Sequence, residues 1–429
     1  MTVLAPSRAG RPVRFRTDEP APAVIVGLDC ITGLQTARLL DARGIPVVGL
    51  VADPGHFCAR TRVPRFIAQG ELRGDGLVAS LERLAEELPG PAVLLPCTDA
   101  AVLAISGAAD RLGGPYRFVL PEHDVVVRLM DKVPFAEHAL ANDLPIPPTM
   151  ILRSRSDAVE AARRLPMPAV IKPGLKTAAW VAATKAKAIP VRTPDELLAT
   201  WDRASAWSDV LIAQSWVAGG EDALFSVNSY HDSTGRPRIA FVARKLRQWP
   251  VDTGTSSLGE EVRDDKVRDI ALRVLGSVPY RGLGYVEIKR DARTGRPQII
   301  EPNIGRPTGR SAIAERGGVE LVLSAYRDAL GQDLPAATEQ RYVGVKWIYW
   351  RHDIQSALVH ARRGELTPAG WLRSVRGPRI EAVGSRRDPG PFVADVANTA
   401  VAVGRGFGRA VARGVGRAVG RRLTRASRG

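Results

Sequence analysis

Long apolar stretches and paired cysteines are the two features that this sequence lacks. No run of about 18 consecutive apolar residues occurs, and that is the length a membrane-spanning helix needs. The three cysteines, Cys30, Cys58 and Cys97, are widely spaced and form no CxxC pair, which argues against a disulfide scaffold and against a zinc site. The N-terminus is basic but lacks the apolar core of a signal peptide. We therefore expect a cytoplasmic protein in which residues 1–20 form a disordered basic arm.

The excess of positive charge is concentrated at the ends of the chain. The net charge is +16, and residues 391–429 hold eight arginines and one aspartate, which contribute +7 of it. Because this charge belongs mainly to the tails, it says little about the folded part. No nucleic-acid recognition motif and no aromatic–basic alternation occurs outside the C-terminal tail, so no specific nucleic-acid partner is expected.

The N-terminal third alternates short apolar runs with helical patterns. Strands are predicted at 23–28, 44–54 and 92–96. Thr98 is placed to cap the helix that follows the last of them. Such alternation predicts an α/β lobe with a doubly wound parallel sheet over residues 21–125. The loop from Gly27 to Gly33 lacks the GxGxxG motif of dinucleotide-binding proteins, so the lobe is expected to border a substrate site instead.

The pattern changes after a helix predicted near 129–142. The proline-rich segment LPIPPT (144–149) predicts a rigid crossing into a second lobe. Beyond it we predict strands and hairpins at 168–174, 184–191, 209–217, 224–245 and 284–303. The second half is thus predicted to be an α+β unit built mostly on antiparallel sheet.

Two glutamates and an asparagine in the last predicted hairpin suggest a metal site. Glu301 and Asn303 are two positions apart on an extended strand, so their side chains share one face. A turn centred near Thr294 would place Glu287 almost opposite Glu301. Like charges across a sheet are destabilising, and hard oxygen ligands of this kind suit Mg²⁺. The alternative, two solvated surface glutamates, is disfavoured by the apolar residues around them.

Two arginines follow this hairpin in a glycine-containing loop. Arg306 and Arg310 lie in the segment Asn303-Ile-Gly-Arg-Pro-Thr-Gly-Arg310, where a guanidinium could clamp phosphate or carboxylate oxygens. Taken alone, each arginine is more commonly a surface charge.

The order of these motifs resembles the ATP-grasp superfamily over about residues 23–335. Within it, the chain is similar to the carboxylate–amine ligases related to the carbamoyl-phosphate synthase large subunit and to bacterial D-aspartate ligases. The resemblance implies a two-lobed ATP-grasp domain after the N-terminal lobe. The implied division is an arm at 1–20, the N-terminal α/β domain at 21–125, an ATP-grasp domain at 126–335 with its small lobe at about 148–217, an appendage at 336–390 and a basic tail at 391–429.

The resemblance also implies a role for each matching residue. It places nucleotide-binding residues at Lys132, at Lys172 in Val-Ile-Lys-Pro, at the adenine hinge Gln214-Ser215-Trp216-Val217 and at the ribose ligand Glu221. It places Lys245 against the γ-phosphate, with Arg306 and Arg310 steadying an acyl phosphate, and it makes Glu287, Glu301 and Asn303 the metal ligands. Phosphoryl transfer depends on positioning and charge neutralisation, which is the chemistry that such a set provides.

One segment departs from the family pattern. The loop after Lys172, PGLKTAAWVAATK, holds a single glycine, whereas many members have a glycine-rich phosphate cover there. Either Lys176 and the backbone serve instead, or the grip on the nucleotide is altered.

The implied activity is ATP-dependent formation of an amide bond between a small carboxylate and an amine. The expected cofactors are ATP and two Mg²⁺ ions, with Mn²⁺ as a substitute, and the expected intermediate is an acyl phosphate. Three alternatives stay open: a carbamoyl-phosphate-forming enzyme, a carboxylating enzyme, and a non-catalytic nucleotide- or polyanion-binding protein. The identity of both substrates and the oligomeric state are not determined by the sequence.

The C-terminal tail suggests a second property. Residues 403–426 run in quartets that start with an apolar residue and carry arginine at the third position. As a helix, such a segment could rest on an anionic membrane surface or an acidic polymer, which would make the protein peripheral to the inner face of the membrane. Its glycines favour the alternative of a solvated, disordered tail.

Overall fold

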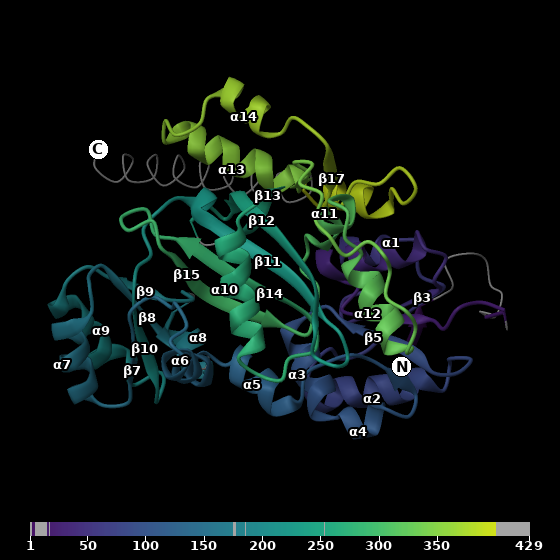
Figure 1. The fold of residues 1–429 in the computed structure, drawn as a ribbon, viewed down its shortest axis with the longest axis horizontal. Helices are drawn as coiled ribbons and strands as arrows, with labels where there is room; N and C mark the ends of the chain where they lie inside the picture. Colours follow the sequence, from purple (N-terminus) through teal and green to yellow (C-terminus); the bar gives the residue numbers. More distant parts are fainter. Residues whose placement is uncertain are drawn as a thin grey trace, which may run out of the picture.

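The computed structural model of this protein describes residues 2–4, 15–16, 18–174, 177–184, 186–252 and 254–399. It contains three sheets with helices packed against them (Figure 1). Within the described residues, no helix combines the length and the apolar character needed to cross a bilayer. The tail quartets at 403–426 and Lys176 lie outside the described residues.

The N-terminal lobe is built on a six-stranded sheet. Its strand order is β1-β4-β3-β2-β5-β6, and the bounds are β1 Thr2–Leu4, β2 Ala23–Val26, β3 Val47–Val51, β4 Phe66–Gln69, β5 Ala92–Pro96 and β6 Tyr116–Arg117. The last five strands are parallel. Strands β2, β3 and β5 are buried at every position, as expected for a sheet that is covered on both faces. The predicted α/β lobe is therefore confirmed.

The expectation of a disordered N-terminal arm is wrong for residues 2–4. They pair antiparallel with Ile67–Gln69 of β4. The physical reason is that β4 would otherwise be the edge of this sheet, with a row of unpaired backbone groups that a passing chain can satisfy.

The helices of this lobe connect successive strands. They are α1 Ile31–Asp41, α2 Gly74–Ala85, α3 Asp99–Gly107, α4 Ala109–Leu112 and α5 His123–Met130, with a short 3₁₀ turn at Phe57–Arg60. Thr98 caps α3 as predicted, because its hydroxyl accepts a hydrogen bond from the backbone N–H of Ala101. The single helix predicted near 129–142 is instead two helices, α5 and α6 (Lys132–Ala141). The side chain of Asp131 starts the second by accepting from Val133 N–H.

The small lobe is a four-stranded antiparallel sheet with the order β7-β10-β8-β9. Its elements are β7 Thr149–Leu152, α7 Arg155–Arg164, β8 Ala169–Pro173, α8 Ala178–Ala183, β9 Ile189–Val191, α9 Pro194–Ala204 and β10 Leu211–Ser215. The strand predicted at 184–191 is shorter than expected. Part of the loop before it forms α8, which buries Trp180 in the lobe's own core.

The large lobe is a seven-stranded sheet with the order β15-β14-β11-β12-β13-β16-β17. The strands are β11 Leu224–His231, β12 Pro237–Trp249, β13 Thr255–Glu261, β14 Gly282–Arg290, β15 Pro297–Ile304, β16 Lys346–Ile348 and β17 Arg379–Glu381. The helices are α10 Asp265–Gly276, α11 Ser311–Arg316, α12 Leu321–Ala329, α13 Trp350–Arg362 and α14 Pro368–Ser374, and a 3₁₀ turn spans Glu221–Ala223. Both predicted hairpins are present, and β16 and β17 show that the segment after residue 335 extends this sheet.

The two faces of the large sheet differ in the side chains that β14 places on them. Val286 and Ile288 of β14 are fully buried in one hydrophobic cluster with residues of α10. Side chains alternate along a strand, so Glu287 points to the opposite face. This alternation explains how a carboxylate can follow and precede core residues without being buried in the core.

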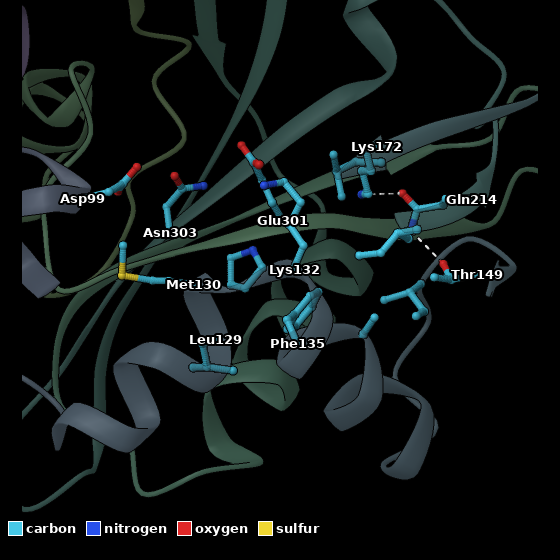
Figure 2. Close-up of a pocket in the computed structure, with 15 residues that line it drawn as sticks. Asp99, Leu129, Met130, Lys132, Phe135, Thr149, Lys172, Gln214, Glu301 and Asn303 are labelled. Carbon is cyan, nitrogen blue, oxygen red and sulfur yellow. Dashed lines mark hydrogen bonds between the residues drawn. The ribbon is translucent and has the colours of Figure 1, made fainter. Parts of the chain in front are cut away.

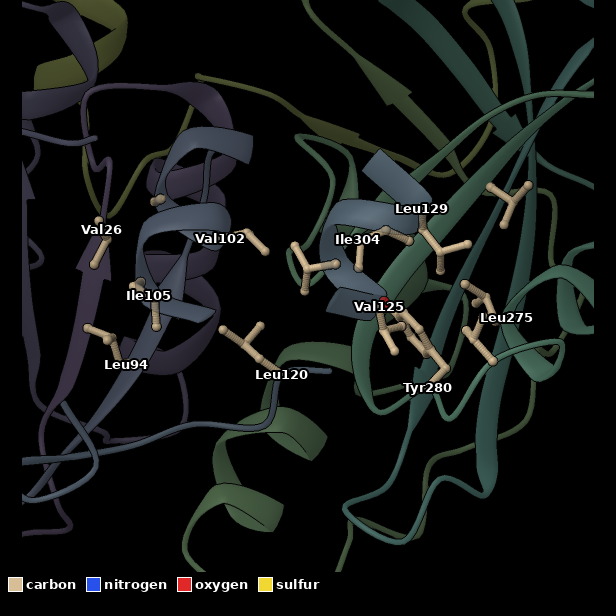
Figure 3. Packing of buried hydrophobic residues seen from close by; sticks show 14 of the residues in the cluster. Val26, Leu94, Val102, Ile105, Leu120, Val125, Leu129, Leu275, Tyr280 and Ile304 are labelled. Carbon is tan, nitrogen blue, oxygen red and sulfur yellow. The ribbon is translucent and has the colours of Figure 1, made fainter. Parts of the chain in front are cut away.

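One continuous core joins the N-terminal lobe to the large lobe. Val102 and Ile105 of α3 belong to the same buried cluster as Tyr280 and Ile304 near the large sheet (Figure 3). The small lobe, in contrast, has a separate cluster of its own. The N-terminal lobe and the large lobe therefore form one packed body. The small lobe meets this body without sharing its core, as is common for domains that move relative to each other.

A buried ion pair fastens the C-terminal helices to the large sheet. Arg247 of β12 donates through Nε and Nη2 to the Asp353 carboxylate of α13, at 2.8 and 3.0 Å, and both side chains are almost completely buried. Trp371 Nε1 donates to the same carboxylate at 2.9 Å.

We predict that Asp353→Ala lowers the free energy of unfolding by about 3–5 kcal/mol, because it leaves the Arg247 charge buried without its partner. Urea denaturation followed by tryptophan fluorescence measures the change. Asp269→Ala removes an exposed partner of Arg268 and should change stability by no more than about 0.5 kcal/mol. Equal effects of the two variants would contradict the prediction.

Candidate active site between the lobes

A cleft of about 190 Å³ lies where the three lobes meet (Figure 2). Each lobe contributes to its wall: the N-terminal lobe through Asp99, the small lobe through Lys172 and Gln214, and the large lobe through Glu301 and Asn303. Lys132, at the start of α6, also lines it. Five of the residues singled out from the sequence are thus brought together: Lys132, Lys172, Gln214, Glu301 and Asn303.

Lys172 is held in the cleft by neutral partners. Its Nζ donates to Gln214 Oε1 at 3.0 Å, and Gln214 Nε2 donates in turn to Thr149 Oγ1 at 2.8 Å (Figure 2). Burial and the nearby Lys132 lower the pKa of Lys172 to about 8, and the attraction of Glu301 opposes this only in part. Among the described residues, the hydrogen-bond acceptor of this ammonium is a neutral amide oxygen. Such an ammonium is suited to an anion, since an opposite charge would favour its protonated form.

Lys132 adds a second positive centre. It is the first residue of α6, and Met130 and Lys132 both line the cleft, so the N-terminal end of this helix borders it. A phosphate at this point would meet the ammonium together with the positive end of the helix dipole.

Glu287 and Glu301 lie directly opposite each other across β14 and β15, as the turn position predicts. Burial and then the facing Glu287 raise the pKa of the Glu301 carboxyl, against the pull of Lys172 and Lys132. The ladder has a bulge next to this pair, so that Ile288 opposes Ile299 while Glu287 opposes Glu301. Bulges redirect side chains, and here Ile299 is fully buried in the core while Glu301 lines the cleft.

Two acidic oxygens and an amide oxygen fit a hard divalent cation. Asn303 follows Glu301 on the same strand, and both line the cleft. Two like charges held in register are stabilised by a cation between them. No cluster of three or more His, Cys, Asp or Glu side chains suited to a metal occurs in the described part of the chain. A metal at this site would therefore depend on the asparagine, with substrate oxygens completing its shell.

Arg306 connects the large lobe to the N-terminal lobe. Its Nε donates to Asp99 at the start of α3, its Nη2 donates to Asn303 Oδ1 at 2.9 Å, and its guanidinium lies 5.4 Å from the centre of the Tyr285 ring. Sequence reasoning missed Asp99 and Tyr285. A signal for Asp99 does exist, because it follows Thr98 at the carboxyl end of a parallel strand, next to the point where the strand order reverses.

Arg310 and Lys245 are more buried than a loop arginine and a strand lysine would suggest. Arg310 is only 7% exposed and donates to Ser256 and Ser226 of the large sheet. Lys245 donates to Gln248 Oε1 at 3.0 Å. Burial lowers the pKa of both, while the nearby Glu287 favours their charged forms. Arg310 is therefore a fixed charge anchored on the sheet, rather than the free clamp expected from its loop.

The predicted hinge residues lie at the end of β10. Ser215 N–H donates to Pro148 O at 2.9 Å and Trp216 N–H donates to Pro168 O at 2.8 Å. Among the described residues, Val217 N–H has no backbone acceptor. Two backbone N–H groups of the hinge are thus used within the fold, and the N–H of Val217 is left to bind a ligand. The side chain of Gln214 accepts the hydrogen bond from Lys172.

Glu221 lies in the 3₁₀ turn after the hinge and is already engaged. Its carboxylate accepts from the backbone N–H groups of Gln248 and Asp252, each at 2.9 Å. Its Oε2 is also 3.4 Å from His360 Nε2 of α13. No pattern in the sequence selects His360.

The chain is similar in sequence to several curated ligases over about half of its length. No known family profile matches the chain. It is 23% identical over 226 residues to a putative glutamate–cysteine ligase of Frankia alni, covering 52% of this chain and 55% of that protein. It is 22% identical over 233 residues to the D-aspartate ligase of Enterococcus faecium (52% and 54% covered) and 26% identical over 204 residues to a D-alanine–D-alanine ligase of Chromobacterium violaceum (46% and 64%). The chain thus spans little more than half the length of these curated relatives.

Solved structures match more of the chain at lower identity. N5-carboxyaminoimidazole synthetase from Staphylococcus aureus complexed with ADP aligns with a TM-score of 0.59 at 14% identity, covering 75% of this chain and 80% of that one. Biotin carboxylase from Campylobacter jejuni aligns with a TM-score of 0.58 at 14% identity, covering 74% and 72%. Both are ATP-grasp enzymes, so the chain has the ATP-grasp fold, and its resemblance to ATP-grasp ligases is confirmed.

We predict that affinity for ADP weakens about tenfold between pH 7 and pH 9. Lys172, with a pKa of about 8 in the free protein, is charged below that pH and loses its proton above it, so the attraction for phosphate falls as pH rises. Calorimetric titration at both pH values measures the change. Lys172→Arg keeps its charge throughout and should show a smaller pH dependence. A wild-type affinity that is flat from pH 7 to pH 9 would contradict the prediction.

Proposed function

We propose that this protein is an ATP-dependent, magnesium-requiring ligase that activates a carboxylate as an acyl phosphate and joins it to an amine. The observation that carries the proposal is the cleft itself. It sets Lys132 and Lys172 against Glu301, which faces Glu287 in register. Lysine ammonium groups that can bind a triphosphate thus lie close to carboxylate oxygens that can bind a metal ion. Phosphoryl transfer requires this arrangement.

In this proposal the small lobe and its hinge hold the nucleotide. Val217 N–H supplies the contact to adenine, and Glu221 accepts from the ribose hydroxyls through its remaining lone pairs. Lys132 and Lys172 bind the phosphate oxygens. Because the small lobe has a core of its own, it can close over the nucleotide and exclude water from an intermediate that is prone to hydrolysis.

Charged groups of the large lobe surround the reacting phosphate. Glu287, Glu301 and Asn303 would hold Mg²⁺, which supplies charge neutralisation on the β- and γ-phosphates. Lys245 faces the γ-phosphate from β12. Arg310 adds a fixed positive charge that needs no reorganisation during the reaction, because serines of two strands already orient it.

The chemistry then follows two displacements. A carboxylate oxygen of the substrate attacks the γ-phosphorus, the bond to the β–γ bridging oxygen breaks, and ADP leaves. An amine nitrogen next attacks the acyl carbon, phosphate departs, and the nitrogen loses a proton to give the amide. Arg306, fixed between Asp99 and Asn303, steadies the acyl phosphate.

A carboxylating reaction is the second candidate. It is favoured by the fold similarity to N5-carboxyaminoimidazole synthetase and biotin carboxylase. Dependence of ATP hydrolysis on bicarbonate, rather than on an organic acid, would identify it. A non-catalytic nucleotide- or polyanion-binding protein is less well supported, since Glu287 and Glu301 keep their facing register.

We predict that one organic carboxylate in a panel of amino acids and small acids stimulates phosphate release from Mg-ATP. With hydroxylamine as the trapping amine, the same acid should yield a hydroxamate. Glu301→Ala should lower this turnover by at least about 10²–10³-fold while leaving the melting temperature unchanged. Glu82→Ala, on the surface of the N-terminal lobe, is the matched control. A Glu301→Ala variant of normal activity would refute the site.

The C-terminal tail is proposed as an anchor for anionic lipid. The described chain ends in a helical segment, 390–399, that exposes Phe392, Val393 and Val396. It leads into residues 400–429, which hold eight arginines and no acidic residue. Apolar residues followed by clustered arginine are typical of segments that bind anionic membrane surfaces.

We predict that the full chain sediments with phosphatidylglycerol vesicles at low salt and is released at high salt. Deleting residues 400–429 should abolish sedimentation, and neutral phosphatidylcholine vesicles are the control. Sedimentation of the truncated chain at the full level would show that the tail is not the anchor.

A further inference from the structure

Helix α13, which follows the large sheet's strand β16, reaches the predicted ribose ligand. The Glu221 side chain is only 9% exposed, and its two oxygens accept from the backbone N–H groups of Gln248 in β12 and of Asp252 in the β12–β13 connection. His360, near the C-terminal end of α13, places Nε2 at 3.4 Å from Glu221 Oε2. A residue far beyond the hinge turn in the sequence thus lies against the carboxylate that is proposed to bind the ribose.

His360 is oriented for this contact by a second carboxylate. Its Nδ1 lies 2.7 Å from Glu365 Oε2. Its Nε2 is buried and has no hydrogen-bond partner within the usual geometry among the described residues. Both ring nitrogens can donate only when the imidazole is protonated. The ring therefore lies between two carboxylates, with Nδ1 hydrogen-bonded to Glu365 and Nε2 close to Glu221 without a hydrogen bond between them.

The same carboxylate is linked to Lys245 through Gln248. Gln248 donates its backbone N–H to Glu221, while its side-chain oxygen accepts from Lys245 Nζ at 3.0 Å. Arg363, the C-cap of α13, donates to Asp252 in the β12–β13 connection, at 3.1 Å. Residues at the end of α13 thus contact both Glu221 and Asp252.

We propose that His360 is a specificity-determining positioning residue, which orients Glu221 so that its free lone pairs accept the ribose hydroxyls of the nucleotide. This inference rests on the proposed function, because it requires a nucleotide in the cleft. A carboxylate fixed to accept from a hydroxyl discriminates strongly against an analogue that lacks the hydroxyl. The C-terminal segment then sets the preference of the enzyme for a ribonucleotide over a 2′-deoxyribonucleotide.

The test compares ATP with 2′-deoxy-ATP. The ratio of their kcat/KM values, measured by phosphate release with the stimulating acid, should be about tenfold or more in the wild-type protein. His360→Ala should reduce this ratio to about threefold or less and raise the KM for ATP, with kcat for ATP within about twofold of wild type. His360→Gln, which keeps an N–H donor, should recover part of the ratio. Arg362→Ala, exposed on the same helix, should leave the ratio unchanged.

Two kinds of failure are distinguishable. If the ratio is the same in the wild-type protein and in His360→Ala, His360 does not position Glu221, and the ligase assignment is unaffected. If no acid stimulates ATP turnover, the proposed function fails. Calorimetric binding of ADP and 2′-deoxy-ADP then replaces the kinetic ratio, and equal discrimination by both proteins would overturn the inference on its own.

Discussion

Two carboxylates, Glu287 and Glu301, lie in register across β14 and β15, and the rest of the site is arranged around that pair. The strands cannot separate to relieve the repulsion, because Val286, Ile288 and Ile299 on the same strands are fully buried in the core. The repulsion is balanced instead by positive charge: the nearby lysines and Arg310 act on the two carboxylates. A polyphosphate with its metal would complete this balance, which is the physical basis for assigning phosphoryl transfer to the cleft.

The shared core of the N-terminal and large lobes has a functional consequence. It holds α3 against the end of β15, so that Asp99 can pair with Arg306 from a distant part of the chain. That pair keeps the guanidinium beside Asn303 instead of letting it turn to solvent. Among the described residues the small lobe instead packs around a cluster of its own.

The segment after residue 335 is part of the large lobe. Its strands β16 and β17 continue the large sheet, and Asp353 of α13 neutralises Arg247 in its interior. Register irregularities occur in β12 near Lys245 and Arg247, where Lys245 donates to Gln248 and Arg247 donates to Asp353 of α13. Because α13 is fixed in this way, His360 has a defined place beside Glu221.

The order of the lobes, both hairpins and the facing pair of glutamates follow from the sequence alone. Strand periodicity and turn position are local properties, so they suffice to place Glu287 opposite Glu301. Local pattern does not place His360 beside Glu221, because it arrives there through packing between elements far apart in the chain.

Three further features likewise lie beyond local pattern: the bulge that separates Ile299 from Glu301, the pairing of residues 2–4 with β4, and the burial of Arg310. Each depends on which backbone groups are left unpaired and which volumes are left unfilled once the sheets meet. Such conditions arise only when distant segments pack together, so they are properties of the folded chain as a whole.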